Sequence, residues 1–161
     1  MRSSIVEALI WTVLLGNGLM AGIYLAFSSF IMRSFATMPV AHGIAAMNAI
    51  NATILKSPFM PIFFGSTGAS IVLIAVGAWF WGEPGTGQAI AAGATYVVGM
   101  FAVTAFCNVP LNNALADVGD DDAHASLVWS RYLQRWTRWN TVRALASAAS
   151  FICCVHMLGA F

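Results

Sequence analysis

Charged residues are scarce in this chain. Asp, Glu, Lys and Arg make up only 8% of its 161 residues, whereas soluble domains carry about 25%. Apolar residues account for 60%, which is more than a soluble core of this size requires. The net charge is +1, and seven dispersed Lys and Arg residues provide no basic face for nucleic acid. The composition therefore predicts an integral membrane protein whose partner is the lipid bilayer, with no nucleic-acid partner.

Motifs for metal or phosphate chemistry are also missing. The three cysteines lie inside apolar runs and lack the spacing of zinc sites or of a disulfide framework. His42, His124 and His156 form no i, i+4 pair and no cluster with carboxylates. No Gly-rich phosphate loop or nucleophile elbow is found. We therefore predict no metal site and no tightly bound cofactor.

Four long apolar segments dominate what is present. Crossing the hydrocarbon core takes about 20 helical residues, and only helices or closed barrels satisfy the backbone there. The first segment is longer than a signal-peptide core of about 7–15 residues, and no small-residue cleavage site follows it. We therefore predict an all-α fold in which residues 1–161 form one membrane domain. The predicted transmembrane helices cover residues 8–32, 59–81, 89–109 and 142–161.

The connections between the segments differ in character. Residues 35–57 are mildly polar and predict a short interfacial helix. Residues 82–87 are rich in Gly and Pro, which indicates a tight turn. Residues 110–140 form the only substantial polar region, and its later part is predicted to be helical. Within it, the acidic run Asp120 to Asp122 is predicted to be a solvated loop.

Cations gather on one side of the predicted topology. The first and third connections hold most of them, whereas the opposite side has only Arg2. The positive-inside rule then places both long connections in the cytoplasm and both termini outside, as expected in a bacterial inner membrane. The cations on the predicted cytoplasmic side are Arg33, Lys56, Arg131, Arg135 and Arg138, with Arg143 at its edge.

Residues 125–143 separate into two helical faces at about 100° per residue. One stripe, roughly 80° wide, carries Trp129, Tyr132, Trp136, Asn140 and Arg143. The opposite face carries three arginines, which suit lipid headgroups. Arg143 begins the last apolar segment, where a guanidinium either snorkels to the headgroups or turns inward to a polar partner or cavity. Its place on the aromatic stripe favours the inward orientation.

Asparagines converge on the same membrane end. Pro110 is predicted to bend or end the third transmembrane helix, leaving Asn108 and Asn112 either as local caps or as pocket residues. The first connection adds Asn48 and Asn51. Amides, aromatic rings and one guanidinium together suit a flat aromatic ligand with phenolic or enolic oxygens.

The first segment adds Asn17, Tyr24 and Ser28 on one helical face. Asn17 lies deep in the membrane and Tyr24 beneath the predicted pocket, where either interhelical hydrogen bonds or ligand binding explain them. His42 is either a solvated loop residue or a base within reach of the pocket.

Small residues four apart lie on two of the apolar segments. Gly18 and Gly22 form one pair, and Gly65 and Ala69 form the other. This spacing lets helix backbones approach closely. The pairs predict close contacts either inside the bundle or with a second copy in a homo-oligomer.

Four sequence blocks and two single residues form a set with a fixed order and spacing. The blocks are MNAIN at 47–51, PFM at 58–60, NVPLNN at 108–113 and WTRWNTVR at 136–143, and Trp129 and Tyr132 lie between the last two. This set resembles the anthrone oxygenase-like family of small four-helix membrane proteins, and the resemblance covers nearly the whole chain. The resemblance implies an oxygenase that converts a hydrophobic anthrone into an anthraquinone with O2, without a metal or flavin.

The resemblance also implies roles for particular residues. An anthrone anion can itself donate an electron to O2, so the protein must bind it, favour the anion and exclude water. His42 or Tyr132 is the available base. The predicted catalytic residues are Asn108, Tyr132, Asn140 and Arg143, and the predicted substrate contacts are Asn48, Asn51, Asn112, Trp129 and Trp136.

Two other functions remain open from the sequence. Four-helix membrane bundles often hold haem or quinones, although His42 and His156 are predicted at opposite ends. A non-catalytic membrane subunit or a small transporter is the other alternative.

Overall fold

The computed structural model describes residues 4–118 and 124–159. All its regular elements are helices, and no strand occurs within these ranges. Four helical stretches are long and apolar enough to cross a membrane, which confirms the predicted all-α bundle of four transmembrane helices. They are Ser4–Ala36, Phe59–Trp79, Thr86–Ala116 and Ala125–Leu158. The predicted Asp120 to Asp122 loop and the last two residues of the predicted fourth helix lie outside the described residues.

The first span is one long helix with an irregular segment in its second half. It is followed by an oblique helix, which confirms the helix predicted within residues 35–57 but leaves its place at a membrane interface a prediction. A short elbow at residues 55–58 then leads into the second span. The elements are α1 (Ser4–Ala26), the π-helical η1 (Phe27–Ile31), α2 (Met32–Ala36), α3 (Val40–Ile54) and α4 (Phe59–Trp79).

The third and fourth spans are longer than the sequence indicates. Pro110 does not end the third helix, which continues through η3 and α6 without a break as far as Ala116. The polar residues from 125 onward join the last span in one helix of 35 residues. The elements are α5 (Thr86–Tyr96), the π-helical η2 (Val97–Ala102) and η3 (Thr104–Asn108), α6 (Val109–Ala116) and α7 (Ala125–Gly159).

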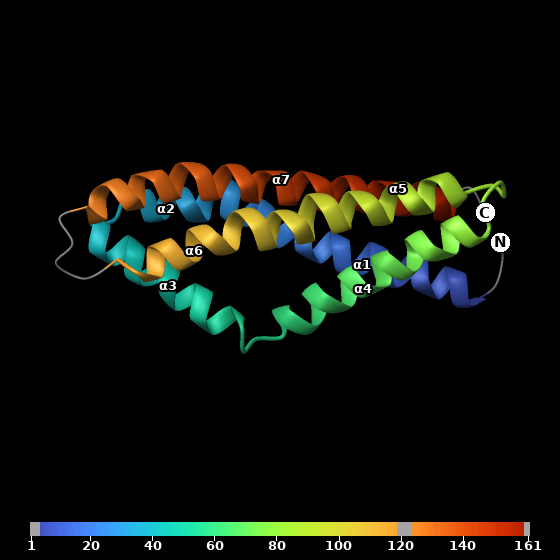
Figure 1. Ribbon diagram of the computed structural model, residues 1–161, viewed down its shortest axis with the longest axis horizontal. Helices are drawn as coiled ribbons and strands as arrows, with labels where there is room; N and C mark the ends of the chain where they lie inside the picture. The colour runs from blue at the N-terminus through green and yellow to red at the C-terminus, as the bar shows by residue number, and fades with distance from the viewer. Residues whose placement is uncertain (1–3, 119–123, 160–161) are drawn as a thin grey trace.

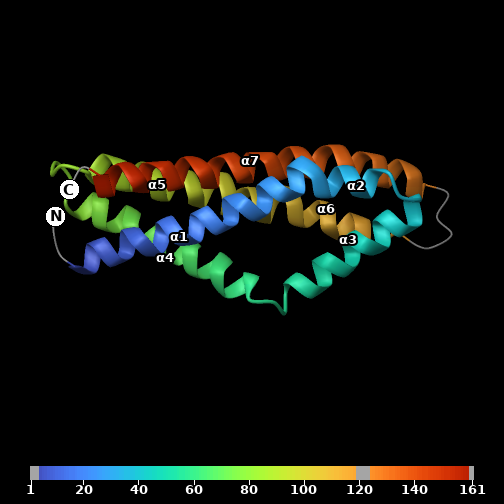
Figure 2. The ribbon, with the colours of Figure 1, turned by 180° about the vertical axis from the view of Figure 1, so that it is seen from behind.

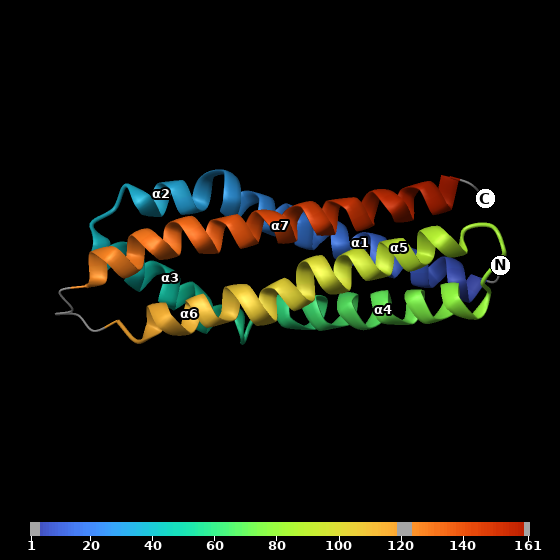
Figure 3. The same ribbon diagram turned by 45° about the horizontal axis from the view of Figure 1, so that its top comes forward.

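The helices form an elongated bundle, with α7 along its upper edge in the view of Figure 1. α7 lies between the first span and the third (Figure 3). The α4–α5 turn lies at the same end as the chain's first and last described residues, and α2 lies at the other end (Figure 2). α3 and α4 meet at an open angle, so the elbow stands away from α7. This V of helices positions the functional site.

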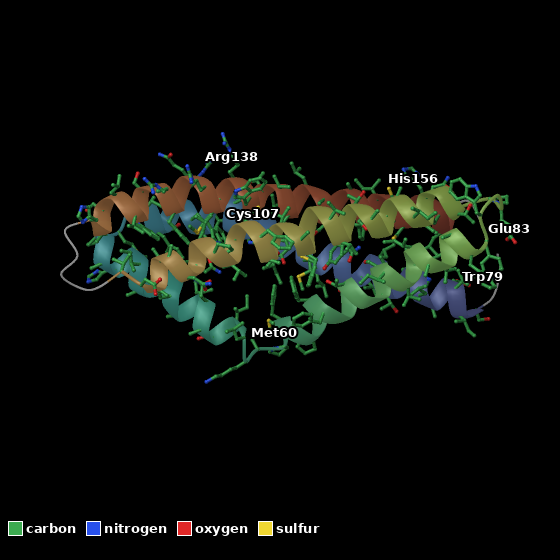
Figure 4. The ribbon with its side chains drawn as sticks, in the orientation of Figure 1. Met60, Trp79, Glu83, Cys107, Arg138 and His156 are labelled. Atoms are coloured by element: carbon green, nitrogen blue, oxygen red, sulfur yellow. The ribbon has the colours of Figure 1, made fainter. Side chains whose placement is uncertain are left out.

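The predicted faces of α7 are separated as expected. Arg131, Arg135 and Arg138 are exposed, whereas Arg143 is buried. Arg138 points away from the bundle, and His156 lies toward the opposite end of α7 (Figure 4). The arginine face is therefore free to meet lipid headgroups, and the aromatic face packs inward.

The small residues serve different neighbours. A Cβ at Gly18 would lie 3.1 Å from the Phe151 ring, so this glycine admits α7 to α1. Gly22 and Gly65 have no such neighbour within 4 Å among the described residues. Asn17 donates a 2.8 Å hydrogen bond to Ser150, which is the interhelical role weighed from the sequence. The predicted homo-oligomer stays a prediction, and the outward glycines are its candidate surface.

Candidate functional site

A cavity of about 580 Å³ lies between the α3–α4 V, the first span, the η2–η3–α6 helix and α7. Its volume falls within the range of about 300–1,000 Å³ that is usual for small-molecule sites. Aromatic and aliphatic side chains form most of its wall. Its polar lining residues are Asn48, Asn51, Thr104, Asn112, Asn113, Asn140 and Arg143.

Arg143 is turned into the bundle and lines the cavity with only 6% of its surface exposed. Its Nη2 donates a 2.7 Å hydrogen bond to Asn140 Oδ1, and its Nη1 donates one of 3.2 Å to Thr104 Oγ1. The guanidinium carbon lies 4.3 Å from the ring centroid of Tyr24 and 5.3 Å from that of Trp136. Hydrogen bonds and cation–π contacts thus hold the cation inside the span, as its place on the aromatic stripe predicts.

Asn140 connects this guanidinium to the first span. Besides accepting from Arg143, it donates through Nδ2 to the Tyr24 carbonyl and to Ser28 Oγ, both at 2.7 Å. Both N–H groups of its amide and one acceptor site of its oxygen are therefore used within the protein. Although Asn140 lines the cavity, its geometry favours positioning Arg143 over direct polar contact with a ligand.

Two residues that hydrogen-bond to Arg143 or Asn140 lie in π-helical segments. Ser28 lies in η1, and Thr104 begins η3. π-helical turns are rare and often occur at functional sites, because the extra residue rearranges backbone and side-chain directions. Two of the three π segments thus supply hydrogen-bond partners to the Arg143–Asn140 pair.

Three aromatic residues of α7 form a continuous stack. Trp129 and Tyr132 have centroids 5.8 Å apart at 12°, and Tyr132 and Trp136 are 5.9 Å apart at 22°. Of the three, Trp136 lines the cavity. Trp129 instead packs against Gly43 of α3, where a Cβ would come within 2.6 Å of the indole. The stack therefore fixes α3 against α7 and presents one indole to the cavity.

Tyr132 and Asn108 lie behind the cavity wall. The Tyr132 hydroxyl donates a 2.8 Å hydrogen bond to Asn112 Oδ1, and Asn112 does line the cavity. Asn108 is buried and donates to the Trp136 carbonyl at 3.2 Å. Tyr132 and Asn108 are thus placed to support lining residues, not to touch a ligand.

The amides of α3 lie on the cavity side of that helix. Asn48 and Asn51 both line the cavity, and Asn48 Nδ2 reaches the Leu115 carbonyl at 3.5 Å. The predicted site residues are thus divided between wall and support. Those in the wall are Asn48, Asn51, Asn112, Trp136, Asn140 and Arg143, and those behind it are Asn108, Trp129 and Tyr132.

A comparison with protein families identifies the sequence family of the chain. The sequence profile described as anthrone oxygenase matches residues 59–153, more than half of the chain. The chain belongs to the anthrone oxygenase family. The matched region runs from α4 into the C-terminal half of α7 and includes Thr104, Asn112 and Arg143, but not Asn48 or Asn51. Comparisons with curated proteins and with solved structures give no match.

Part of the cavity wall is not predicted from the sequence of this anthrone oxygenase family member. Thr104 is one such residue, because it lies four residues before Asn108 but its direction is set by the π-helical segment η3. Tyr24 lines the cavity that the sequence places above it. A chain of rings joins it to Phe59, Phe63 and Phe101, with successive centroids 6.5, 5.8 and 5.6 Å apart. Phenylalanines in apolar segments look like ordinary core residues, so only the fold reveals this wall.

His42 and His156 lie away from the cavity. His42 is exposed in the first turn of α3, and it is not among the residues that line the cavity. His156 is exposed near the far end of α7 (Figure 4). Neither side chain is placed to accept a proton from a ligand beside Arg143.

Two buried donors on lining residues, Arg143 Nε and Trp136 Nε1, lack a hydrogen-bond partner within residues 4–118 and 124–159. The acceptor Asn48 Oδ1 is likewise unpaired. A buried donor left unpaired costs about 1–3 kcal/mol. Because these three atoms are themselves fully buried, a ligand in the cavity reaches them only if neighbouring side chains move.

Proposed function

We propose that this protein is a membrane-bound oxygenase that uses O2 to oxidise a hydrophobic, anthrone-type aromatic substrate. The family supports oxygenase-like chemistry. The observation that carries the proposal is Arg143, a buried cation in the wall of an aromatic cavity of about 580 Å³.

The wall chemistry supports a flat aromatic substrate. Phe59, Phe63, Phe101 and Trp136 offer ring faces and edges, and aromatic rings favour offset or edge contacts with one another. A guanidinium at the same cavity favours an oxygen that bears negative charge. An anthrone enolate has both features.

The proposed reaction begins with loss of a proton from the substrate's ring CH2 group, which gives the enolate. Arg143 stabilises the charge on the enolate oxygen, and burial strengthens this interaction. The anion donates an electron to O2, the two radicals combine at the former CH2 carbon, and the peroxide anion so formed takes up a proton. Loss of water from the resulting hydroperoxide leaves a new carbonyl, so one oxygen atom enters the quinone and the other leaves as water.

This chemistry needs no resident metal or flavin, because the electron-rich anion itself reduces O2. The proposed protein contribution is therefore binding of the substrate and stabilisation of the anion's charge. The described lining residues include no His, Asp or Glu. Tyr132 already donates its hydroxyl proton to Asn112. We accordingly assign the main effect to Arg143, which lowers the free energy of the anion, with water as the proton acceptor.

The orientation in the membrane is part of the proposal. Arg33, Lys56 and the three exposed arginines of α7 are in or beside α2, the elbow and the N-terminal half of α7. The positive-inside rule supports a cytoplasmic position for this end and an external position for the α4–α5 turn. A bacterial inner membrane is the membrane proposed.

The decisive test is oxidation of an anthrone by purified protein in lipid nanodiscs, followed by quinone absorbance and O2 consumption. We expect faster quinone formation than in nanodiscs without protein. Loss of one charge-stabilising donor group typically lowers turnover by about 10²–10³-fold, so Arg143→Lys and Arg143→Ala should lose most activity. Arg138→Ala, which changes an exposed arginine of the same helix, is the matched control.

Two results would count against this proposal. Quinone formation no faster than spontaneous oxidation removes the oxygenase function. Full activity in Arg143→Ala removes the proposed site.

A quinone-binding protein is the second candidate, because the same rings and cation fit a quinone. Haem is less well supported, since His42 and His156 lie near opposite ends of the bundle and cannot ligate one iron together. The visible spectrum of the purified protein separates these cases. Ligand binding without turnover would favour a non-catalytic subunit or a transporter.

A further inference from the structure

The cavity reaches the outer surface of the bundle through apolar side chains. Leu55, Phe64 and Val109 all line it, and their exposed fractions are 65%, 55% and 41%. Ala105, on the helical turn before Val109, is also exposed and lines the cavity. These four residues form the mouth of the cavity. A mouth made of apolar groups is stable against lipid and costly against water.

The mouth lies along the sides of the helices and not at an end of the bundle. Phe64 belongs to α4, Ala105 and Val109 belong to the η3–α6 helix, and Leu55 begins the elbow. Figure 1 shows the elbow set apart from the η3–α6 helix, and Met60, another lining residue, lies beside it in Figure 4. Phe64, Ala105 and Val109 lie within stretches long and apolar enough to span the membrane. Lipid chains therefore face this opening.

Polarity changes along the cavity. Phe63, Phe64 and Phe101 belong to α4 and η2, whereas Asn48 and Asn51 belong to α3 and Asn112 to α6. Aromatic walls thus lie toward the middle of the spans and amides toward the connections. A flat aromatic with polar oxygens orients in the same way in a bilayer, with rings among the chains and oxygens near the headgroups.

We propose that the site is filled sideways from the bilayer, through the mouth between Phe64 and Val109, by a membrane-dissolved aromatic compound with oxygen substituents. The identity of the natural compound rests on the proposed function, whereas the route is a binding property that can be measured without turnover. The compound keeps its orientation as it moves from the lipid into the cavity. Its rings need not cross water.

The test uses the full-length protein in vesicles with a hydroxyanthraquinone, which the proposed reaction cannot oxidise further. Stopped-flow quenching of tryptophan fluorescence reports binding, since Trp136 lies in the wall. Val109→Phe narrows the mouth without touching Arg143. We expect association and dissociation to slow together by about tenfold, equivalent to a barrier of about 1.4 kcal/mol, with an unchanged Kd.

Two comparison variants separate the route from the site. Val98→Phe adds the same bulk at an exposed position of η2 that does not line the cavity, and its rates should match the parent's. Arg143→Lys should raise the Kd, mainly through faster dissociation. A sulfonated anthraquinone confined to water should not bind the parent.

Several results would overturn the lateral route. These are unchanged rates in a folded Val109→Phe variant, binding of the sulfonated compound, or absence of hydroxyanthraquinone binding by the parent. If brominated lipid quenches the tryptophan fluorescence and the hydroxyanthraquinone does not reverse this quenching, the occupant of the cavity is an acyl chain instead. Slower binding in Val109→Phe, together with no anthrone oxidation by the parent, would support the lateral route and contradict only the proposed function.

Discussion

The hydroxyl of Tyr132 donates a 2.8 Å hydrogen bond to the side-chain oxygen of Asn112. Tyr132 itself is buried between two indole rings, whereas Asn112 lines the cavity. The bond occupies the acceptor end of the Asn112 amide and leaves its NH2 group available as a donor. Tyr132 is therefore a positioning residue, and the base role that the sequence left open for it is not favoured by this geometry.

Tyr132→Phe tests this relationship. The substitution keeps the ring stack and removes one hydrogen bond worth about 0.5–1.5 kcal/mol, so we expect KM to rise by roughly two- to tenfold with a smaller change in kcat. Asn112→Ala should have a similar effect. Because the two side chains act through one contact, the double variant should be no worse than the more severe single variant. Additive losses would contradict the positioning role.

Thr104→Val tests the support of Arg143 from η3. Valine preserves the shape but removes the hydroxyl that accepts from Nη1. Hydrogen bonds to charged groups contribute about 1.5–3 kcal/mol, and we expect kcat for anthrone oxidation to fall by at least about tenfold. A steady-state assay in nanodiscs measures this effect. Thr12→Val, at an exposed threonine of α1, is the matched control and should retain parental activity.

Asn140→Ala should weaken the fold as well as the site. The substitution removes hydrogen bonds that join α7 to Tyr24 and Ser28 of the first span. Interhelical bonds in membranes average about 0.6 kcal/mol each, and the freed Arg143 donor adds about 1–3 kcal/mol. We expect the free energy of unfolding to fall by about 2–4 kcal/mol, measured by denaturation in detergent. Gln134→Ala, exposed on α7, should change it little.

Gly43→Ala tests the packing of α3 on the aromatic stack. The added methyl would lie 2.6 Å from the Trp129 ring, so α3 or the indole must move. Overpacking of this kind costs about 1–3 kcal/mol, and displacement of α3 should also weaken hydroxyanthraquinone binding, because Asn48 and Asn51 are on the same helix. Gly68→Ala in α4 has open space and should be neutral or stabilising. Equal behaviour of the two variants would exclude the packing role.

The sequence predicts the bundle and the inward turn of Arg143, because hydropathy defines spans and helical phase defines faces. The sequence does not show which residues of a helical face line the cavity and which are covered by another helix. Trp129, Tyr132 and Trp136 share one stripe, yet only Trp136 of these lines the cavity. Which residue is covered depends on where α3 and α6 cross α7, and these crossings are tertiary contacts.

The π segments limit prediction in a second way. Each widened turn shifts the angular position of every later residue relative to an ideal α-helix. Thr104 and Asn108 therefore cannot be assigned to faces from 100° spacing alone. The sequence also does not give the direction in which α3 runs. This direction places Asn51 in the cavity wall and His42 on the surface.

The 21 residues of α4 make it the shortest of the four spans, and a helix of that size is about 31 Å long, close to the thickness of the hydrocarbon core. Since the elbow is joined directly to the N-terminal end of α4, this helix acts as a spacer that sets how deep the elbow lies. In lipids with longer acyl chains the elbow, with its exposed Lys56, would be pulled below the carbonyl layer. Catalysis should therefore depend on acyl-chain length and be fastest where bilayer thickness matches this one helix.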